Sequence, residues 1–428
     1  MNTKPQILLR GGRVIDPSQN LDRVMNVLVE DGRITAYDIQ PSGREIELDV
    51  SGKIVAPGLI DLHTHLREPG GEDAETIASG CNAAVNGGYT SIACIPNTNP
   101  PIDTPADVEF IRSQAAKADR CNVYVVACIS KERKGEELSE MGHLAKAGAV
   151  AFSDDGSSVA NAELMRRAFE YAKICKLPIF DHCEDLNLAN RGTMNEGLVS
   201  MRLGLRGIPA AAEDVMTARD IMLTASTGGR LHVMHVSTAR SVDLVRRAKQ
   251  AGINVTAEVT PHHLTLTEEC MTTFDSNFKM SPPLRTQADV DACRAGLLDG
   301  TLDCVSTDHA PHSLEKKQRE IDIAPFGVTG LETALGVLST ELVHTGIFTW
   351  NQLIEKMSTN PARILGIERG TLAIGSVADI VVIDPELRWT VTPECFLSRS
   401  TNNAYLGREF VGRATTVLVG GRIRLSRK

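Results

Sequence analysis

Short apolar runs alternate with longer amphipathic segments between residues 56 and 365. Runs of this length, bounded by turn residues, predict buried strands, and the segments 161–175, 211–225 and 240–251 predict helices between some of them. Strands that alternate with helices form a parallel sheet, because parallel neighbours need a crossover connection. The expected strands are 58–62, 89–95, 123–129, 149–153, 178–180, 231–234, 255–259 and 302–306.

Eight parallel strands with crossover helices predict an α/β fold of the (β/α)8 TIM-barrel type, whose active sites lie at the carboxyl ends of the strands. The alternative is an open, doubly wound sheet. No Gly-x-Gly-x-x-Gly follows an early strand, so the sequence gives that alternative no dinucleotide-binding motif.

Both ends of the chain have a different pattern from the middle. Residues 7–55 contain short alternating apolar runs separated by glycine turns, and the same pattern returns at 379–384 and 416–422. Because chain termini often lie close together, we expect a small β-sandwich-like domain built from residues 1–55 and 366–428, beside a barrel of residues 56–365.

Charge and apolar content exclude several classes of protein. The 428 residues carry a net charge of −9 without long like-charge runs, which argues against a nucleic-acid or membrane-surface partner. No apolar run reaches membrane-spanning length, and the first ten residues lack a signal-peptide core, so we expect a cytoplasmic protein. The ten cysteines lack C-x-x-C spacing and are expected to be reduced core residues.

His63 and His65 lie two apart at the end of the first barrel strand. Side chains at i and i+2 of a strand point the same way, so both imidazoles converge beyond its carboxyl end. Two structural histidines are the alternative for this pair taken alone. Four other expected strands also run into a histidine or aspartate, which predicts a shared metal site with the further ligands Asp155, His182, His235 and Asp308.

These six side chains are too many for one ion. A single catalytic zinc takes three protein ligands and a water, whereas two zinc ions bridged by one carboxylate and a hydroxide use all six. Such a pair provides a nucleophile at neutral pH and polarises a carbonyl group. The sequence therefore predicts hydrolysis, or reversible closure, of an amide.

The chain resembles the amidohydrolase superfamily and, within it, the bacterial dihydroorotases with an all-aspartate metal site. The resemblance covers nearly the whole chain and is carried by the segments 55–67, 96–98, 152–156, 181–184, 258–264, 306–312 and 324–327. It implies that His63, His65 and Asp308 hold one zinc, that His182 and His235 hold the other, and that Asp155 bridges them. In the related allantoinases, hydantoinases and other dihydroorotases a carboxylated lysine on the fourth strand bridges the metals. Residues 152–155 contain no lysine, so Asp155 is expected to do that work, which favours a dihydroorotase of the all-aspartate type.

The resemblance also implies a set of substrate contacts. Arg67 and Asn97 are expected to bind the substrate carboxylate, and a guanidinium suits a carboxylate because it pairs with both oxygens. Further contacts are expected from His65, His312, Phe326 and Gly327, with a mobile surface loop as the alternative for the last two. The family reads Asn in Lys-Met-Asn-Pro-Pro where this chain has Ser281, whose shorter side chain leaves affinity or substrate choice open. His262, His263 and His309 are expected to be structural or to support the ligands.

The implied reaction is the reversible cyclisation of N-carbamoyl-L-aspartate to L-dihydroorotate in pyrimidine synthesis. Asp308 is the expected catalytic residue, taking a proton from the zinc-bridged hydroxide and delivering it to the leaving nitrogen. One alternative is a cyclic amidase for hydantoin or allantoin. Another is a non-catalytic partner of aspartate transcarbamoylase, although the filled ligand positions argue against a silent site. A homodimer and a complex with that enzyme both stay open.

Overall fold

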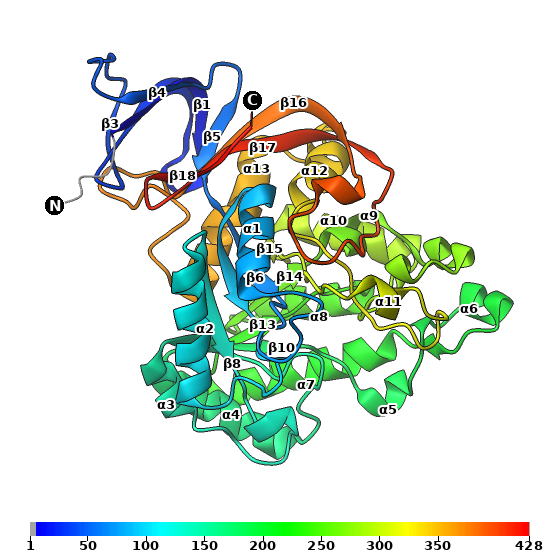
Figure 1. Ribbon diagram of the computed structural model, residues 1–428. Coiled ribbons are helices and arrows are strands. Elements are labelled where there is room, and N and C mark those ends of the chain that lie inside the picture. Colours follow the sequence, from blue (N-terminus) through cyan, green and yellow to red (C-terminus); the bar gives the residue numbers. More distant parts are fainter. Residues whose placement is uncertain (1–5, 428) are drawn as a thin grey trace.

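The computed structural model describes residues 6–427 (Figure 1). Residues 1–5 of the expected N-terminal segment lie outside this range, as does residue 428. The described chain contains a barrel sheet of eight parallel strands and a second eight-stranded sheet built from both ends of the chain, which confirms the predicted fold class. Within residues 6–427, none of the helices has the length and apolar character that crossing a membrane requires.

All eight expected barrel strands are present. They pair in chain order, each parallel to its neighbours, as β6 (Leu59–Thr64), β7 (Tyr89–Cys94), β8 (Asn122–Ala127), β9 (Ala149–Phe152), β10 (Ile179–Asp181), β13 (Leu231–Val233), β14 (Val255–Val259) and β15 (Cys304–Val305).

The first and last strands close the barrel at their carboxyl ends. Thr64 forms a parallel bridge with His309, and the His65 amide donates to the His309 carbonyl over 2.9 Å. Below that point the Thr307 amide donates to the Asp61 carboxylate at 3.1 Å. These contacts bring residues just after β6 beside residues just after β15.

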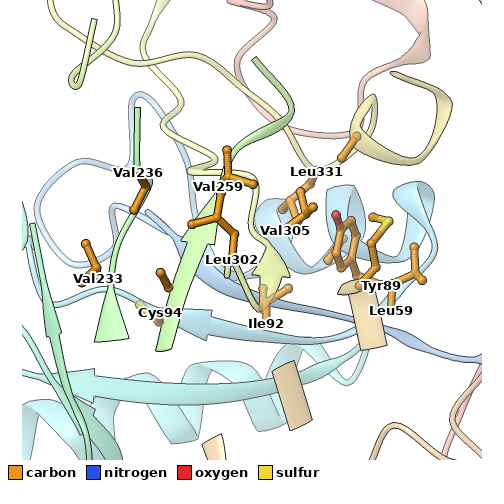
Figure 2. Close-up of a cluster of buried hydrophobic side chains, with 14 of the residues drawn as sticks. Leu59, Tyr89, Ile92, Cys94, Val233, Val236, Val259, Leu302, Val305 and Leu331 are labelled. Atoms are coloured by element: carbon orange, nitrogen blue, oxygen red, sulfur yellow. The ribbon is translucent and has the colours of Figure 1, made fainter. Parts of the chain in front are cut away.

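Alternation along the strands divides the barrel core into two layers. One layer faces the surrounding helices and contains Leu59, Ile92, Val233, Val259 and Val305, each from a different strand (Figure 2). The other fills the interior together with residues of α14 (Asn360–Leu365), and comprises Ile60, Leu62, Ala93, Ile95, Val126, Ala151, Phe180, Met234, Cys304, Ala362, Ile364 and Leu365. The packed interior leaves the carboxyl ends of the strands as the place for a site.

Helices follow the barrel strands and cover the outer face of the sheet (Figure 1). The main ones are α1 (Ile77–Gly87), α2 (Pro105–Ala118), α3 (Met141–Ala147), α4 (Ala162–Cys175), α7 (Ala211–Thr227), α8 (Ala239–Gln250) and α10 (Gln287–Asp299). Two shorter helices, α12 (Ala334–Leu338) and α13 (Trp350–Ile354), contact strands of the second sheet. Thr76, Thr104 and Thr286 begin three of the main helices with capping boxes, in which side chains satisfy free amides of the first turn. Three helices expected from the sequence correspond to α4, α7 and α8.

Short elements lie in the connections at the carboxyl ends of the strands. They are α5 (Leu186–Ala189), β11 (Met194–Asn195), α6 (Leu198–Leu203), β12 (Gly207–Ile208), α9 (Pro261–Thr265) and α11 (Leu314–Lys317). In Figure 1, α5 and α6 extend away from the barrel.

The two ends of the chain meet in one β domain. Its strands form a single sheet in the order β18 (Arg422–Ser426), β17 (Glu409–Val419), β16 (Ile380–Thr390), β5 (Ile54–Pro57), β1 (Ile7–Asp16), β2 (Leu21–Glu30) and β3 (Arg33–Tyr37), with β4 (Ile46–Asp49) beside β1. A shared core takes Val14 and Val27 from one end and Ile380 and Leu418 from the other. β5 belongs to this sheet and leads directly into β6, so the barrel begins where the β domain ends.

Candidate active site

Six buried side chains meet at the carboxyl ends of the barrel strands. They are the side chains expected from the sequence: His63 on β6 and His65 just after it, Asp155 after β9, His182 after β10, His235 after β13 and Asp308 after β15. Each is at most 6% exposed. The structure therefore brings all six predicted ligands to one place.

The six side chains form two groups that share Asp155. In the first group, Nε2 of His65 lies 2.9 Å from Oδ1 of Asp308, and Nε2 of His63 lies 3.4 Å from the same oxygen. In the second, Oδ1 of Asp155 lies 3.3 Å from Nδ1 of His182 and 3.7 Å from Nε2 of His235. Asp155 also lies 3.7 Å from His63 and 3.6 Å from His65, so its carboxylate stands between the groups.

The donor atoms of this cluster suit divalent metal ions. Nε2 of His63 and Oδ1 of Asp155 are buried and have no hydrogen-bond partner among the described residues. Buried polar atoms normally have hydrogen-bond partners. Two buried atoms without a partner in one cluster therefore indicate that both are placed to bind a metal ion. Imidazole and carboxylate are common ligands of zinc, and the donor atoms of His63, His65 and Asp308 all lie within 4.8 Å of one another, as do those of His63, Asp155 and His235.

Electrostatics keep the two carboxylates ionised. Burial favours the neutral acid, but the imidazoles of His63 and His65 outweigh it and hold the pKa of Asp308 below its ordinary value. Burial is likewise outweighed at Asp155, where His63 and His182 hold the carboxyl pKa well below its usual range. Both groups are therefore in the form that binds a cation or accepts a proton.

Neighbouring side chains orient the imidazoles. Nδ1 of His63 donates to Glu258 over 2.9 Å, and Nδ1 of His65 donates to the Asn97 side-chain oxygen over 2.9 Å, so Nε2 of each ring faces the cluster. Supporting contacts of this kind set the tautomer and direction of metal-binding histidines. Sequence reasoning assigned Glu258 no role, although a glutamate in the otherwise uncharged strand β14 was an available signal.

The segment that carries Asp155 is fixed by its neighbours. Asp154 accepts from the backbone amides of Ile129 and Ser130 at 2.9 and 3.1 Å, which ties the end of β9 to the end of β8. The Asp155 amide donates to Ser153 Oγ at 3.0 Å, and the guanidinium of Arg133 donates to the Asp155 carbonyl. These contacts hold the shared carboxylate in place without a lysine.

Three site residues have a left-handed backbone. The φ angles are 61° at Arg67, 31° at His235 and 48° at Asp308. Residues with a Cβ rarely adopt this region, and such conformations are concentrated at functional sites that the surrounding structure holds in place. No pattern in the sequence predicts these turns.

A cavity of about 540 Å³ opens above the cluster. Every residue expected to bind substrate lines it, namely His65, Arg67, Asn97, Ser281, His312, Phe326 and Gly327. Its wall also includes residues that sequence reasoning missed, namely Glu184, Leu186, Ala189, Arg191, Gly192, Ile208 and Ala310. Most of these lie between β10 and α7, in the connection that holds α5 and α6. The unusual length of this connection was the only signal in the sequence that it contributes to the site.

Arg67 gives the cavity a partly buried positive charge. Burial lowers its pKa to about 10, so the guanidinium remains charged at neutral pH. Its Nε donates to the Pro311 carbonyl at 3.2 Å, and it forms no ion pair with any carboxylate in the described part of the chain. Burial also lowers the pKa of His312 to about 3, so this imidazole is neutral beside Arg67. The arrangement can bind an anion.

The remaining histidines stay outside the cavity wall. His263 contacts Thr260 Oγ1 at 2.8 Å and the Pro282 carbonyl at 3.0 Å, and His309 contacts Glu75 at 3.3 Å. His262 is also buried. The contacts of His263 and His309 agree with the structural roles expected for these two residues.

Comparisons with known proteins identify the relatives of this chain. Residues 52–241 match the family model described as dihydro-orotase-like. The chain is 51% identical to the dihydroorotase of Pelotomaculum thermopropionicum, with 98% of each chain covered, and 50% identical to that of Pelobacter propionicus, with 97% of this chain and 99% of the relative covered.

Solved structures of cyclic amide hydrolases have the same fold. Dihydropyrimidinase from Brevibacillus agri matches with a TM-score of 0.86 and 25% identity, covering 99% of this chain and 95% of that one. D-Hydantoinase from Bacillus sp. AR9 matches with a TM-score of 0.86 and 27% identity over the same shares. The full-length likeness at half identity is decisive, and the chain belongs to the dihydroorotase family.

Proposed function

We propose that this enzyme catalyses the reversible cyclisation of N-carbamoyl-L-aspartate to L-dihydroorotate in pyrimidine synthesis. The observation that carries the proposal is the presence of two elements in one cavity: the double histidine–aspartate cluster and the guanidinium of Arg67, which has no ion-pair partner within residues 6–427. The cluster suits hydrolysis of an amide, and the guanidinium suits a substrate that carries a carboxylate.

The six clustered residues would hold two zinc ions. His63, His65 and Asp308 form one group, His182 and His235 form the other, and Asp155 is shared. Bound zinc supplies Lewis acidity, which activates a water and polarises the amide carbonyl. The carboxylate of Asp308 accepts the proton of the attacking water and returns it to the ring nitrogen that leaves.

Arg67 and Asn97 position the substrate carboxylate. The Asn97 oxygen accepts from His65, so its NH₂ group remains as a donor to a ligand. A carboxylate held by this NH₂ and by Arg67 lies beside His65, which orients the ring amide toward the cluster. Ser281 and His312 line the same cavity and would contact the polar edge of the ring, and Phe326 and Gly327 would bound its face.

Turnover tests this proposal. L-Dihydroorotate incubated with zinc-replete protein should lose its ring-amide absorbance, a chelator should stop the loss, and added zinc should restore it. Two zinc ions bound per chain without turnover of L-dihydroorotate would refute the substrate assignment.

A hydantoinase-like activity is the second candidate, because the solved structures named above are a dihydropyrimidinase and a hydantoinase. Hydantoin and dihydrouracil lack the carboxylate that Arg67 would pair with. A substrate panel separates the two: the first proposal expects L-dihydroorotate to be preferred, and preference for an uncharged ring would support the second.

We further propose that the enzyme works in the cytoplasm on small molecules, without nucleic-acid or membrane partners. A homodimer and a complex with aspartate transcarbamoylase are the two assemblies to test. Gel filtration gives the mass of the enzyme alone, and co-elution at micromolar concentration tests the complex. Clean separation of the two enzymes would count against it.

A further inference from the structure

Lys317 is a buried lysine behind one wall of the cavity. It is the last residue of α11 and is only 3% exposed, whereas the preceding Lys316 lies on the surface and pairs with Asp73 at 2.7 Å. Lysine is rarely buried unless its ammonium is paired. The position of Lys317 therefore needs an explanation that Lys316 does not.

The Lys317 ammonium is bound by backbone carbonyls. Nζ donates to the carbonyls of Gly327 at 3.0 Å and Pro325 at 3.1 Å, and lies 3.5 Å from that of Lys279. A charged ammonium has three N–H donors, which match these three acceptors. No carboxylate in residues 6–427 lies within ion-pair distance of it, so the three carbonyls are what compensates the buried charge.

These carbonyls belong to the two segments that form the cavity wall. Phe326 and Gly327 line the cavity from one segment, and Ser281 lines it two residues after Lys279 in the other. The segments also pair directly, because the Gly327 amide donates to the Lys279 carbonyl at 3.0 Å. Lys317 thus binds both segments without lining the cavity itself.

Further contacts fix the same wall. The His312 imidazole donates to the Phe326 carbonyl at 2.7 Å, and the Lys279 ammonium lies 4.5 Å from the centre of the Phe326 ring. A second donor, the Asn402 side chain, reaches the Gly327 carbonyl at 3.1 Å. The wall is therefore a bonded unit that joins substrate-facing residues from three parts of the chain.

We propose that Lys317 is a positioning residue, whose charged ammonium sets the wall formed by Ser281, Phe326 and Gly327 and favours an anionic substrate in front of it. This inference rests on the proposed function, because it concerns the substrate of that same cavity. Lys317 does not line the cavity, so it acts through the backbone of the wall and through its charge.

The surroundings make this charge adjustable near neutral pH. Burial, and then the nearby Lys279, lower the pKa of Lys317 to about 7, while Asp275 opposes the shift. His312, on the far side of the wall, is neutral. A bound anion favours the protonated ammonium, so by linkage the substrate binds more tightly at a pH below this value.

Substitution tests the inference. Lys317→Met keeps the length and removes the donors, and it should raise KM for L-dihydroorotate about tenfold while kcat and zinc content stay near wild type. Hydrogen exchange of the peptide that contains Phe326 and Gly327 should become faster. Lys316→Met is the matched control and should change none of these. A folded Lys317→Met enzyme with an unchanged KM would overturn the proposal.

The pH profile separates a role of the charge from simple packing. KM of the wild type should rise severalfold between pH 6 and 8.5, and that rise should shrink in Lys317→Met. If Lys317→Met does not fold, the wild-type profile still decides, because a flat KM would overturn the role of the ammonium. If the wild type turns over no dihydroorotate, the proposed function fails. Comparing hydrogen exchange between wild type and Lys317→Met would still test whether Lys317 holds the wall in place.

Discussion

Nδ1 of His63 lies 2.9 Å from Glu258, whose other oxygen lies 3.1 Å from Nε2 of His232. One fully buried carboxylate thus accepts from two imidazoles, and its ionised form is the one that can do so. Burial favours the neutral acid, but His232 and His63 outweigh it and hold the pKa of Glu258 below its ordinary value. The direction of His63 toward the metal cluster depends on this carboxylate.

Glu258→Gln should weaken metal binding. Glutamine has one acceptor oxygen and an NH₂ group, so it cannot accept from both rings, and supporting contacts of this kind contribute roughly 10- to 100-fold to metal affinity. Competition with a chromogenic chelator measures the affinity. Glu269→Gln, on the exposed face of the same region, is the control. Wild-type affinity in Glu258→Gln would show that His63 is oriented by other contacts.

Asp308→Asn should separate metal binding from turnover. The amide keeps an oxygen near His65 but cannot take a proton, so kcat should fall by roughly 10²- to 10⁴-fold while most of the metal remains bound. Elemental analysis and a turnover assay on the same sample measure both. Asp291→Asn, which is exposed on α10, should behave as wild type. Near-normal kcat in Asp308→Asn would contradict the assignment of the catalytic residue.

Arg67→Lys should impair substrate binding although it conserves the charge. Lysine cannot pair with two carboxylate oxygens in a fork, so KM should rise by about tenfold or more with a smaller effect on kcat. Steady-state kinetics with L-dihydroorotate measure the change, and Arg202→Lys on the exposed face of α6 is the control. An equal loss for substrates without a carboxylate would point to a general role of Arg67.

Glu332 should make the stability of the protein depend on pH. Burial raises its pKa from an ordinary value near 4.5 to about 7, and the Leu397 amide donates to it at 2.7 Å. A raised carboxyl pKa contributes stability below pH 4.5 that is lost as the pH rises through 7.

Glu332→Gln imitates the protonated acid and removes this dependence. Relative to the variant, the wild type should lose up to roughly 3 kcal/mol of unfolding free energy between pH 4.5 and 8. Urea unfolding of metal-saturated protein at both pH values measures it, with exposed Glu409→Gln as the control. A constant difference between wild type and Glu332→Gln would show that Glu332 does not titrate on unfolding.

The sequence predicted the strands better than the details of the site. The apolar runs located all eight barrel strands, because each is largely buried and bounded by turn residues. Alternation correctly predicted that His63 and His65 share a direction, but it does not explain why the consecutive Leu62 and His63 both point into the barrel. The pairing of β6 with β7 shifts register between Asp61 and Thr64, and that irregularity depends on the neighbouring strand.

The supporting residues were the least predictable part of the site. Glu258 and Lys317 act on residues far away in the sequence, and no local pattern distinguishes them from ordinary charged residues. Lys316 and Lys317 are adjacent and identical in type, yet only the tertiary structure buries one of them. The family resemblance named the residues that face the cavity and left those behind them unassigned.

His65 and Asp308 are 2.9 Å apart in space and 243 residues apart in the chain, because the closure of the barrel brings its first and last strands together. During synthesis, the first strand leaves the ribosome long before its partner exists. The first metal group therefore cannot be completed until about three quarters of the chain has been made, and tight metal uptake by a nascent chain would report that the barrel has closed.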